Sequence, residues 1–149
     1  MIPWEVWYSH EQDDGIVVTD SAQLDSVLDR IATLSRPEWS ALGTMSSHLG
    51  GSGPVLYIGF HVDVGALLYI NTGDPIRHFS RGGGSPEGDP LLYMYMTSAD
   101  EFPPNAEISA DTVRRAAHEF AETGRRPTCV EWQDWEQPDT DTESEYPGL

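Results

Sequence analysis

The chain has 149 residues, of which 25 are acidic and 8 are basic, and every basic residue is an arginine. A formal charge of −17 argues against a nucleic-acid partner, because phosphate groups attract proteins through Lys and Arg and repel an acidic surface. This charge suits either a basic partner protein or simple solubility, and composition leaves both open. No apolar run approaches the ~18 residues of a membrane span, so we expect no membrane association.

The number of cysteines and the sequence of residues 1–14 indicate in which cellular compartment the protein works. Cys129 is the only cysteine, which excludes an internal disulfide and fits a reducing environment. Residues 1–14 show neither the basic start nor the small-residue cleavage site of a signal peptide. We therefore expect a cytoplasmic protein.

The first third of the chain predicts a hairpin and a helix. Residues 4–11 and 15–20 are typical of two strands joined by a turn. Asp20 is a candidate helix N-cap, Gln23 completes a capping box, and Pro37 prevents continuation of the helix. The predicted apolar face of this helix comprises Leu24, Val27, Leu28, Ile31 and Leu34.

The middle of the chain predicts a sheet. Apolar runs rich in β-branched and aromatic residues predict strands at 55–62, 65–71 and 91–98, with a weaker strand at 76–80. Residues 81–90 contain four glycines and two prolines and are therefore expected to form a loop.

A second helix is predicted between Ser109 as N-cap and Gly124 as C-cap. The last predicted strand covers residues 128–132. The strand spacing of these residues predicts that Cys129 is a small residue of the core. The residues that we expect in the core from both helices and this strand include Leu28, Ile31, Phe120, Cys129 and Trp132.

Together these elements predict an α+β fold. We expect a single domain over residues 1–136, with a mainly antiparallel sheet of about five to seven strands and two helices packed on it. Residues 137–149 are acidic and almost without apolar side chains, which predicts a disordered tail.

The segment 125–133, RRPTCVEWQ, resembles half of a zinc site in a nucleic-acid deaminase. Such an enzyme needs a His-x-Glu and a Pro-Cys-x-x-Cys for its metal ligands and proton shuttle. Here Thr128 separates Pro127 from Cys129, no second cysteine exists, and no histidine has a Glu two residues later. No Walker lysine and no G-x-S-x-G are present either. The sequence thus predicts neither an enzyme of these classes nor a bound metal or other cofactor.

The residues considered so far leave two alternative classes of function open. His61 and Asp63 lie two apart on a predicted strand and could form an acid/base couple in a small hydrolase. A generic acidic adaptor protein is the other alternative.

Residues 101–133, EFPPNAEISADTVRRAAHEFAETGRRPTCVEWQ, resemble the C-terminal signature of an actinobacterial immunity-protein family from polymorphic toxin systems. The matching positions are Phe102, Pro103, Glu107, Val113, Arg114, Glu119, Phe120, Thr123, Gly124, Arg126, Pro127 and Trp132. Upstream, LDSVLDRI and LYIGFHVDVGALLYI are similar to the helix and strands of that family, so the resemblance covers roughly residues 20–133. Its members are commonly encoded beside toxins with deaminase domains, including domains that act on double-stranded DNA. The resemblance implies that this chain is an antitoxin that binds and blocks such a toxin. The excess of acids fits this role, because an acidic inhibitor can occupy the basic surface with which a toxin holds DNA.

Interface positions are predicted from exposed aromatics flanked by acids, since interfaces favour buried aromatic anchors with charged rims. Trp135 lies between Asp134 and Glu136, and further acids occur in predicted turns. The candidate interface residues are Asp63, Asp74, Asp134, Trp135 and Glu136.

Overall fold

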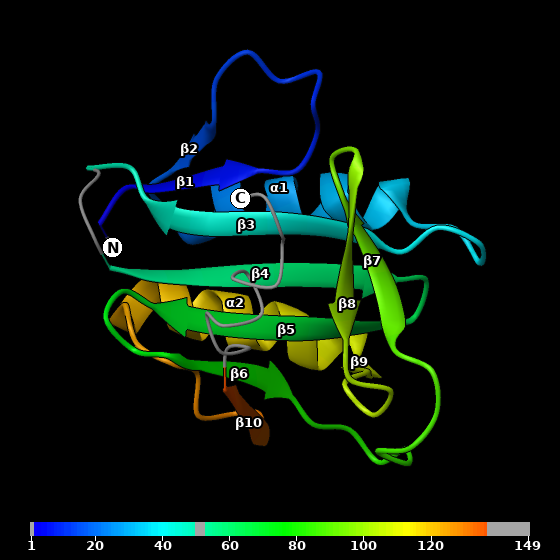
Figure 1. The fold of residues 1–149 in the computed structure, drawn as a ribbon. Coiled ribbons are helices and arrows are strands. Elements are labelled where there is room, and N and C mark those ends of the chain that lie inside the picture. Colours follow the sequence, from blue (N-terminus) through cyan, green and yellow to red (C-terminus); the bar gives the residue numbers. More distant parts are fainter. Residues whose placement is uncertain (1, 50–52, 137–149) are drawn as a thin grey trace, which may run out of the picture.

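The computed structural model describes residues 2–49 and 53–136 (Figure 1). In chain order the elements are β1 (Trp4–Trp7), β2 (Ile16–Val18), α1 (Ser21–Leu34), β3 (Ala41–Ser47), β4 (Pro54–His61), β5 (Val64–Asn71), β6 (Ile76–Ser80), β7 (Leu91–Tyr95), β8 (Ser98–Phe102), β9 (Ile108–Ser109), α2 (Ala110–Thr123) and β10 (Trp132–Glu136). The predicted acidic tail, residues 137–149, lies outside the described residues.

One large sheet organises the molecule. Its strand order is β10-β6-β5-β4-β3-β1-β2, and every neighbouring pair along this path is antiparallel. Both helices cover one face, and the hairpin of β7 and β8 crosses the other face (Figure 1). The predicted α+β class and single domain are confirmed. The predicted number of strands is wrong, because the described residues form ten strands rather than five to seven.

The prediction missed β3, which lies between β4 and β1. Its sequence, ALGTMSS, consists mostly of small residues, includes Ala and Gly, which are depleted in strands, and has no Val, Ile or aromatic residue. Small size is what this position requires, because a Cβ on Gly43 would stand 2.8 Å from Cδ1 of Ile31 on the overlying helix. Pairing on both sides, rather than local propensity, makes this segment a strand.

The prediction of a single strand over 91–98 is also wrong. Tyr95 pairs with Ser98, so the chain reverses between β7 and β8. Met96 occupies the turn with a φ of 57°, in the left-handed region that glycine usually fills. The sequence contains no glycine or proline signal at this reversal, which explains the error.

Both predicted helices have the expected caps. Oδ1 of Asp20 accepts a hydrogen bond from the Gln23 amide at 2.8 Å, and Oγ of Ser109 accepts one from the Thr112 amide at 3.1 Å. Gly124 ends the second helix with a φ of 67°. The sequence predicts these ends correctly because they depend on local residue chemistry.

The two faces of the sheet have separate apolar cores. On the helix face, Leu28, Ile31 and Phe120 are fully buried together with Trp4. On the hairpin face the buried residues are Leu42, Ala66, Leu68, Phe79, Tyr93, Phe102 and Ala106. The hairpin thus closes a second core that a sheet with helices on one face would leave open.

The last strand begins later than predicted, at Trp132 rather than residue 128. The amides of Thr128 and Cys129 donate to the Glu119 carboxylate at 2.8 and 3.2 Å, instead of joining the sheet. Cys129 and Trp132 are partly buried and pack at the edge of the helix-face core. Burial raises the pKa of the Cys129 thiol above its usual value, so this cysteine stays a neutral packing group.

Candidate functional site

The end of the sheet where β6 pairs with β10 brings several predicted interface residues together. Asp134 lies opposite His78 in the ladder, and Trp135 lies opposite Arg77. Because successive side chains of a strand point to opposite faces, Asp134 is on the helix face and Trp135 is on the hairpin face. The two residues that the sequence places side by side therefore belong to different surfaces.

On the helix face, His78 gathers two of the predicted acids. Its Nδ1 lies 2.7 Å from Oδ1 of Asp134, and its Nε2 lies 3.4 Å from Oδ2 of Asp74. An Arg126 guanidinium nitrogen is 2.8 Å from the same Nδ1. The Ile76 amide, followed by His78, holds the pKa of Asp74 below its usual value. This cluster fixes the end of the β5–β6 turn against β10.

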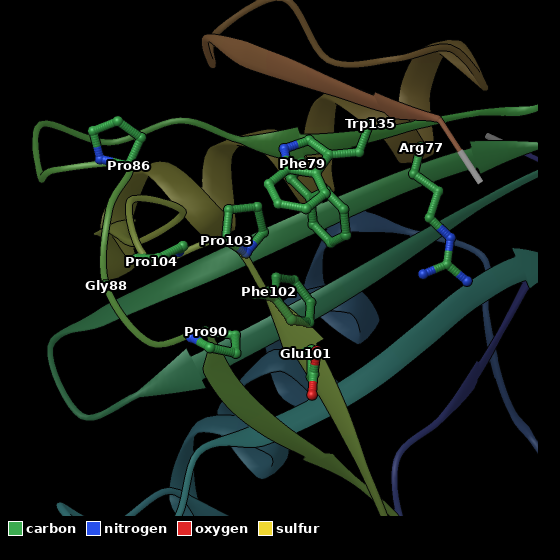
Figure 2. Close-up of a pocket in the computed structure, with 10 residues that line it drawn as sticks. All are labelled: Arg77, Phe79, Pro86, Gly88, Pro90, Glu101, Phe102, Pro103, Pro104 and Trp135. Atoms are coloured by element: carbon green, nitrogen blue, oxygen red, sulfur yellow. The ribbon is translucent and has the colours of Figure 1, made fainter. Parts of the chain in front are cut away.

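On the hairpin face, Trp135 borders a pocket of about 340 Å³ (Figure 2). The pocket is lined by Arg77, Phe79, Pro86, Gly88, Pro90, Glu101, Phe102, Pro103, Pro104 and Trp135. Figure 2 shows the rings of Phe79 and Trp135 together, with Pro86 and Pro90 across from them on the loop that leads to β7. The pocket therefore lies between the sheet edge, the end of β8 and this loop.

Aromatic rings connect the pocket to the core below it. The ring centroids of Phe79 and Trp135 are 6.0 Å apart with the planes at 78°, and those of Phe79 and Phe102 are 5.2 Å apart at 69°. Such edge-to-face pairs are favourable beyond the area that they bury. Phe79 and Phe102 are buried, whereas 48% of Trp135 is exposed. The pocket thus has a fixed floor and one accessible aromatic wall.

Only Arg77 and Glu101 carry charge among the residues that line the pocket. The Nε of Arg77 is buried and has no hydrogen-bond partner among residues 2–49 and 53–136. Burial raises the pKa of nearby Asp100, and the positive charge of Arg77 acts against this rise. The Arg77 charge is therefore offset in part by a neighbouring carboxyl.

The remaining predicted interface residues are not gathered in one place. Asp63 lies in the β4–β5 turn, at the opposite end of β5 from Asp74, and its carbonyl oxygen accepts from the Ala110 amide at 3.1 Å. Glu136 pairs with Ile76 in the ladder at the end of β10. The structure thus unites Asp74 with Asp134 and separates both from Asp63.

The alternative couple of His61 and Asp63 has a different geometry from the one expected. The Nδ1 of His61 lies 3.2 Å from Oε2 of Glu107, and its Nε2 lies 2.9 Å from the Pro37 carbonyl oxygen. The Pro37 carbonyl is the main group that raises the pKa of His61, with support from Glu107. Because both ring nitrogens face oxygen acceptors, this arrangement favours the imidazolium, which has no lone pair for a general base. His61 at the end of β4 thus connects the segment after α1, which contains Pro37, with the segment before β9, which contains Glu107.

Sequence reasoning missed the floor of the pocket. It predicts only a weak strand for residues 76–80 and only a loop for residues 81–90. Alternation along the strand places Arg77 and Phe79 on one face of the sheet. Their contact with the pocket that Phe102 also lines depends on the β7–β8 hairpin, which the sequence analysis did not predict.

Within the described ranges, no three His, Cys, Asp or Glu side chains are grouped so that they could hold a metal ion. Nor does this part of the chain contain a helix long and apolar enough to cross a membrane.

A comparison with models of protein families shows the family to which the chain belongs. The model of the family described as Immunity protein Imm1 matches residues 12–134. The chain belongs to the Imm1 immunity protein family. A search among curated proteins gives no significant match. Membership of Imm1 confirms the resemblance to immunity proteins and indicates an antitoxin that binds a cognate toxin protein.

The Imm1 match includes the His78 cluster and all of the pocket lining except Trp135. It covers the pocket-lining loop at 81–90 and extends to Asp134 in β10. The pocket and the His78 cluster are thus built from the part of the chain that defines the family match, with Trp135 directly after it.

Proposed function

We propose that this Imm1 protein neutralises a toxin that acts on nucleic acid, with a double-stranded DNA deaminase as the toxin class. The observation that carries the proposal is the formal charge of −17 in a member of an immunity family. A toxin that acts on DNA needs a basic surface to hold phosphates, and an acidic protein complements that surface. The deaminase class rests on the resemblance of residues 101–133 to immunity proteins encoded beside such toxins.

The charges within the fold support an acidic binding surface. Arg114 pairs with Asp25 and Asp29, and Arg81 pairs with Glu131 at 3.0 Å. Arginines are the only basic residues and are outnumbered by acids, 8 to 25. Most acidic side chains therefore have no arginine to pair with, and their charge makes the electrostatic potential around the protein negative. A field of one sign steers an oppositely charged partner towards the surface.

Inhibition in this proposal is occlusion. The immunity protein occupies the basic surface on which the toxin would hold DNA, in the cytoplasm of the cell that produces both proteins. Charge complementarity can raise association rates to on the order of 10⁸–10⁹ M⁻¹s⁻¹ at low salt. Rapid capture protects the genome from free toxin.

Co-purification with the toxin domain whose gene adjoins that of this chain tests the proposal. We expect a stable complex, loss of DNA deamination at stoichiometric inhibitor, and competition between the inhibitor and DNA. Stopped-flow mixing over a salt series should show association slowing as salt increases. No complex with the toxin would contradict the function, and association indifferent to salt would contradict the electrostatic part.

A further inference from the structure

The pocket beside Trp135 has the size and rigidity of a binding site. Its volume of about 340 Å³ falls in the range of roughly 300–1,000 Å³ that is typical of ligand pockets. Phe79 and Phe102 are only 3% and 1% exposed, so packing within the hairpin-face core fixes the floor. A side chain entering this pocket would meet preformed apolar walls and would lose little free energy to rearrangement.

Trp135 extends this apolar surface outwards. Single exposed hydrophobic residues are ordinary on protein surfaces. Trp135 differs because its half-exposed ring continues the wall of a hollow that is lined mainly by phenylalanine and proline. It also lies on β10, the last strand in the sheet order. An exposed indole beside an apolar pocket at a sheet edge is suited to be an interface anchor.

Acidic residues occur in the lining of the pocket and directly beside it in the sequence. Glu101 lines it, and the exposed residues Glu87 and Asp89 flank Gly88, which also lines it. None of these three carboxylates forms an ion pair with another described residue. The pocket thus combines an apolar centre with carboxylates that are free to pair with cations of a partner.

We propose that this pocket is where the toxin docks. A large apolar side chain from the basic surface of the toxin enters against Phe79, Phe102 and Trp135. Lysine or arginine residues beside it pair with Glu87, Asp89 and Glu101. An apolar anchor within a charged rim is the usual anatomy of a protein interface. This assignment rests on the proposed function, since it takes the partner to be a basic toxin.

A second groove of about 300 Å³ provides the comparison. It lies at the other end of the β7–β8 hairpin, near Met94 and Met96, and contains Trp39, which is 42% exposed. Glu11 is the one acidic residue of its lining, and His10 lies beside it. The two grooves are similar in size and in their exposed tryptophan, and each is lined by one acidic residue. With the residues that directly flank Gly88 and Trp39 included, the Trp135 pocket has three acids, Glu87, Asp89 and Glu101, and the Trp39 groove has two, Glu11 and Glu38. Complementarity to a basic partner therefore favours the Trp135 pocket.

The first test compares the two tryptophans. We expect Trp135→Ala to raise the dissociation rate of the complex with the adjoining-gene toxin domain by at least about tenfold. Trp39→Ala should change this rate by less than about twofold. Trp135→Phe, which keeps a ring at the pocket, should retain most of the affinity. Thermal melting of each free variant shows whether it is folded before binding is measured.

The second test compares two sets of acids with equal charge. One variant carries Glu87→Gln, Asp89→Asn and Glu101→Gln, and its control carries Glu11→Gln, Asp13→Asn and Asp14→Asn in the distant β1–β2 loop. Each variant removes three negative charges and changes the formal charge from −17 to −14. We expect the pocket set to slow association several-fold more than the control set at low salt. Equal slowing would overturn the local pairing.

Arg77→Gln tests the chemistry of the occupant. With a basic occupant, this change should leave affinity unchanged or improve it, because it removes the positive charge at the pocket. A loss of affinity would identify a carboxylate as the occupant and overturn the assignment.

If the wild-type protein inhibits the toxin while Trp135→Ala dissociates at the same rate, the pocket is not the docking point and the proposed function still stands. If the wild-type protein does not bind the toxin, the proposed function itself fails.

Discussion

The indole N–H of Trp4 donates a hydrogen bond of 3.0 Å to the carbonyl oxygen of Ala121, 117 residues further along the chain. The amide of Arg125, which would donate to this carbonyl in a continuing helix, donates instead to Oγ1 of Thr123 at 3.0 Å. Trp4 thus satisfies one of the carbonyls left free at a helix end. The bond connects the first strand to the last turn of α2.

Replacing Trp4 with Phe should lower the free energy of unfolding by about 1–3 kcal/mol, because a buried carbonyl loses its donor while the ring is largely kept. Chemical denaturation of the two proteins measures this difference. The matched control is Trp39→Phe, since Trp39 is 42% exposed and its substitution should have little effect. Equal stability of wild type and Trp4→Phe would show that this hydrogen bond contributes nothing.

Phe120 packs beside the same indole. Its ring centroid lies 4.7 Å from that of Trp4 and 6.1 Å from that of Tyr69, and its side chain is fully buried. Phe120→Ala should therefore cost ~3–5 kcal/mol through lost burial and the cavity left behind. Val17→Ala, at a position that is 40% exposed, should change stability by less than about 0.5 kcal/mol. A thermal melt that barely moves for Phe120→Ala would contradict this role.

His61 predicts a small pH-dependent contribution to stability. The Pro37 carbonyl, followed by Glu107, raises the pKa of His61 above its unfolded value of about 6.5. The stabilisation is therefore fully present below the unfolded pKa and is lost as pH rises through the folded pKa. The stability difference between wild type and His61→Gln should accordingly be largest below about pH 6 and should shrink as pH rises above about 6.5.

The size of the His61 effect should stay below about 1 kcal/mol, because the His61 and Glu107 side chains are 31% and 28% exposed. Denaturation curves of both proteins at each pH provide the measurement. A difference that grows with pH would mean that His61 is neutral in the folded protein and that its contacts do not favour the imidazolium.

Zinc should not copurify in stoichiometric amount. Cys129 is the only thiol, and the described residues contain no metal-ligating group of three. Elemental analysis after dialysis tests this expectation, and dialysis against a chelator should leave the melting temperature unchanged. One tightly held zinc per chain would contradict the interpretation of this protein as a binding protein without metal.

The sequence by itself determined the features that depend on neighbouring residues. Asp20 and Ser109 begin their helices and Gly124 ends one, because each acts on backbone groups within a few positions. The apolar spacing identified the buried helix face for the same reason, since Leu24, Val27, Leu28 and Ile31 are buried. The prediction is wrong only for Leu34, which is 42% exposed at the last position of the helix. The family resemblance and the excess of acids, both properties of the residues alone, indicated an immunity protein.

Only the tertiary structure decided how distant segments meet. β3 is a strand because β1 and β4 pair with it, and the β7–β8 turn relies on a left-handed Met96 that no sequence pattern signals. Pairing of β6 with β10 sends Asp134 to His78 and Trp135 to Phe79, on opposite faces of the sheet. Once the register between β6 and β10 is fixed, alternation of side chains places Asp134 and Trp135 on opposite faces. That register depends on contacts between residues more than 50 positions apart along the chain.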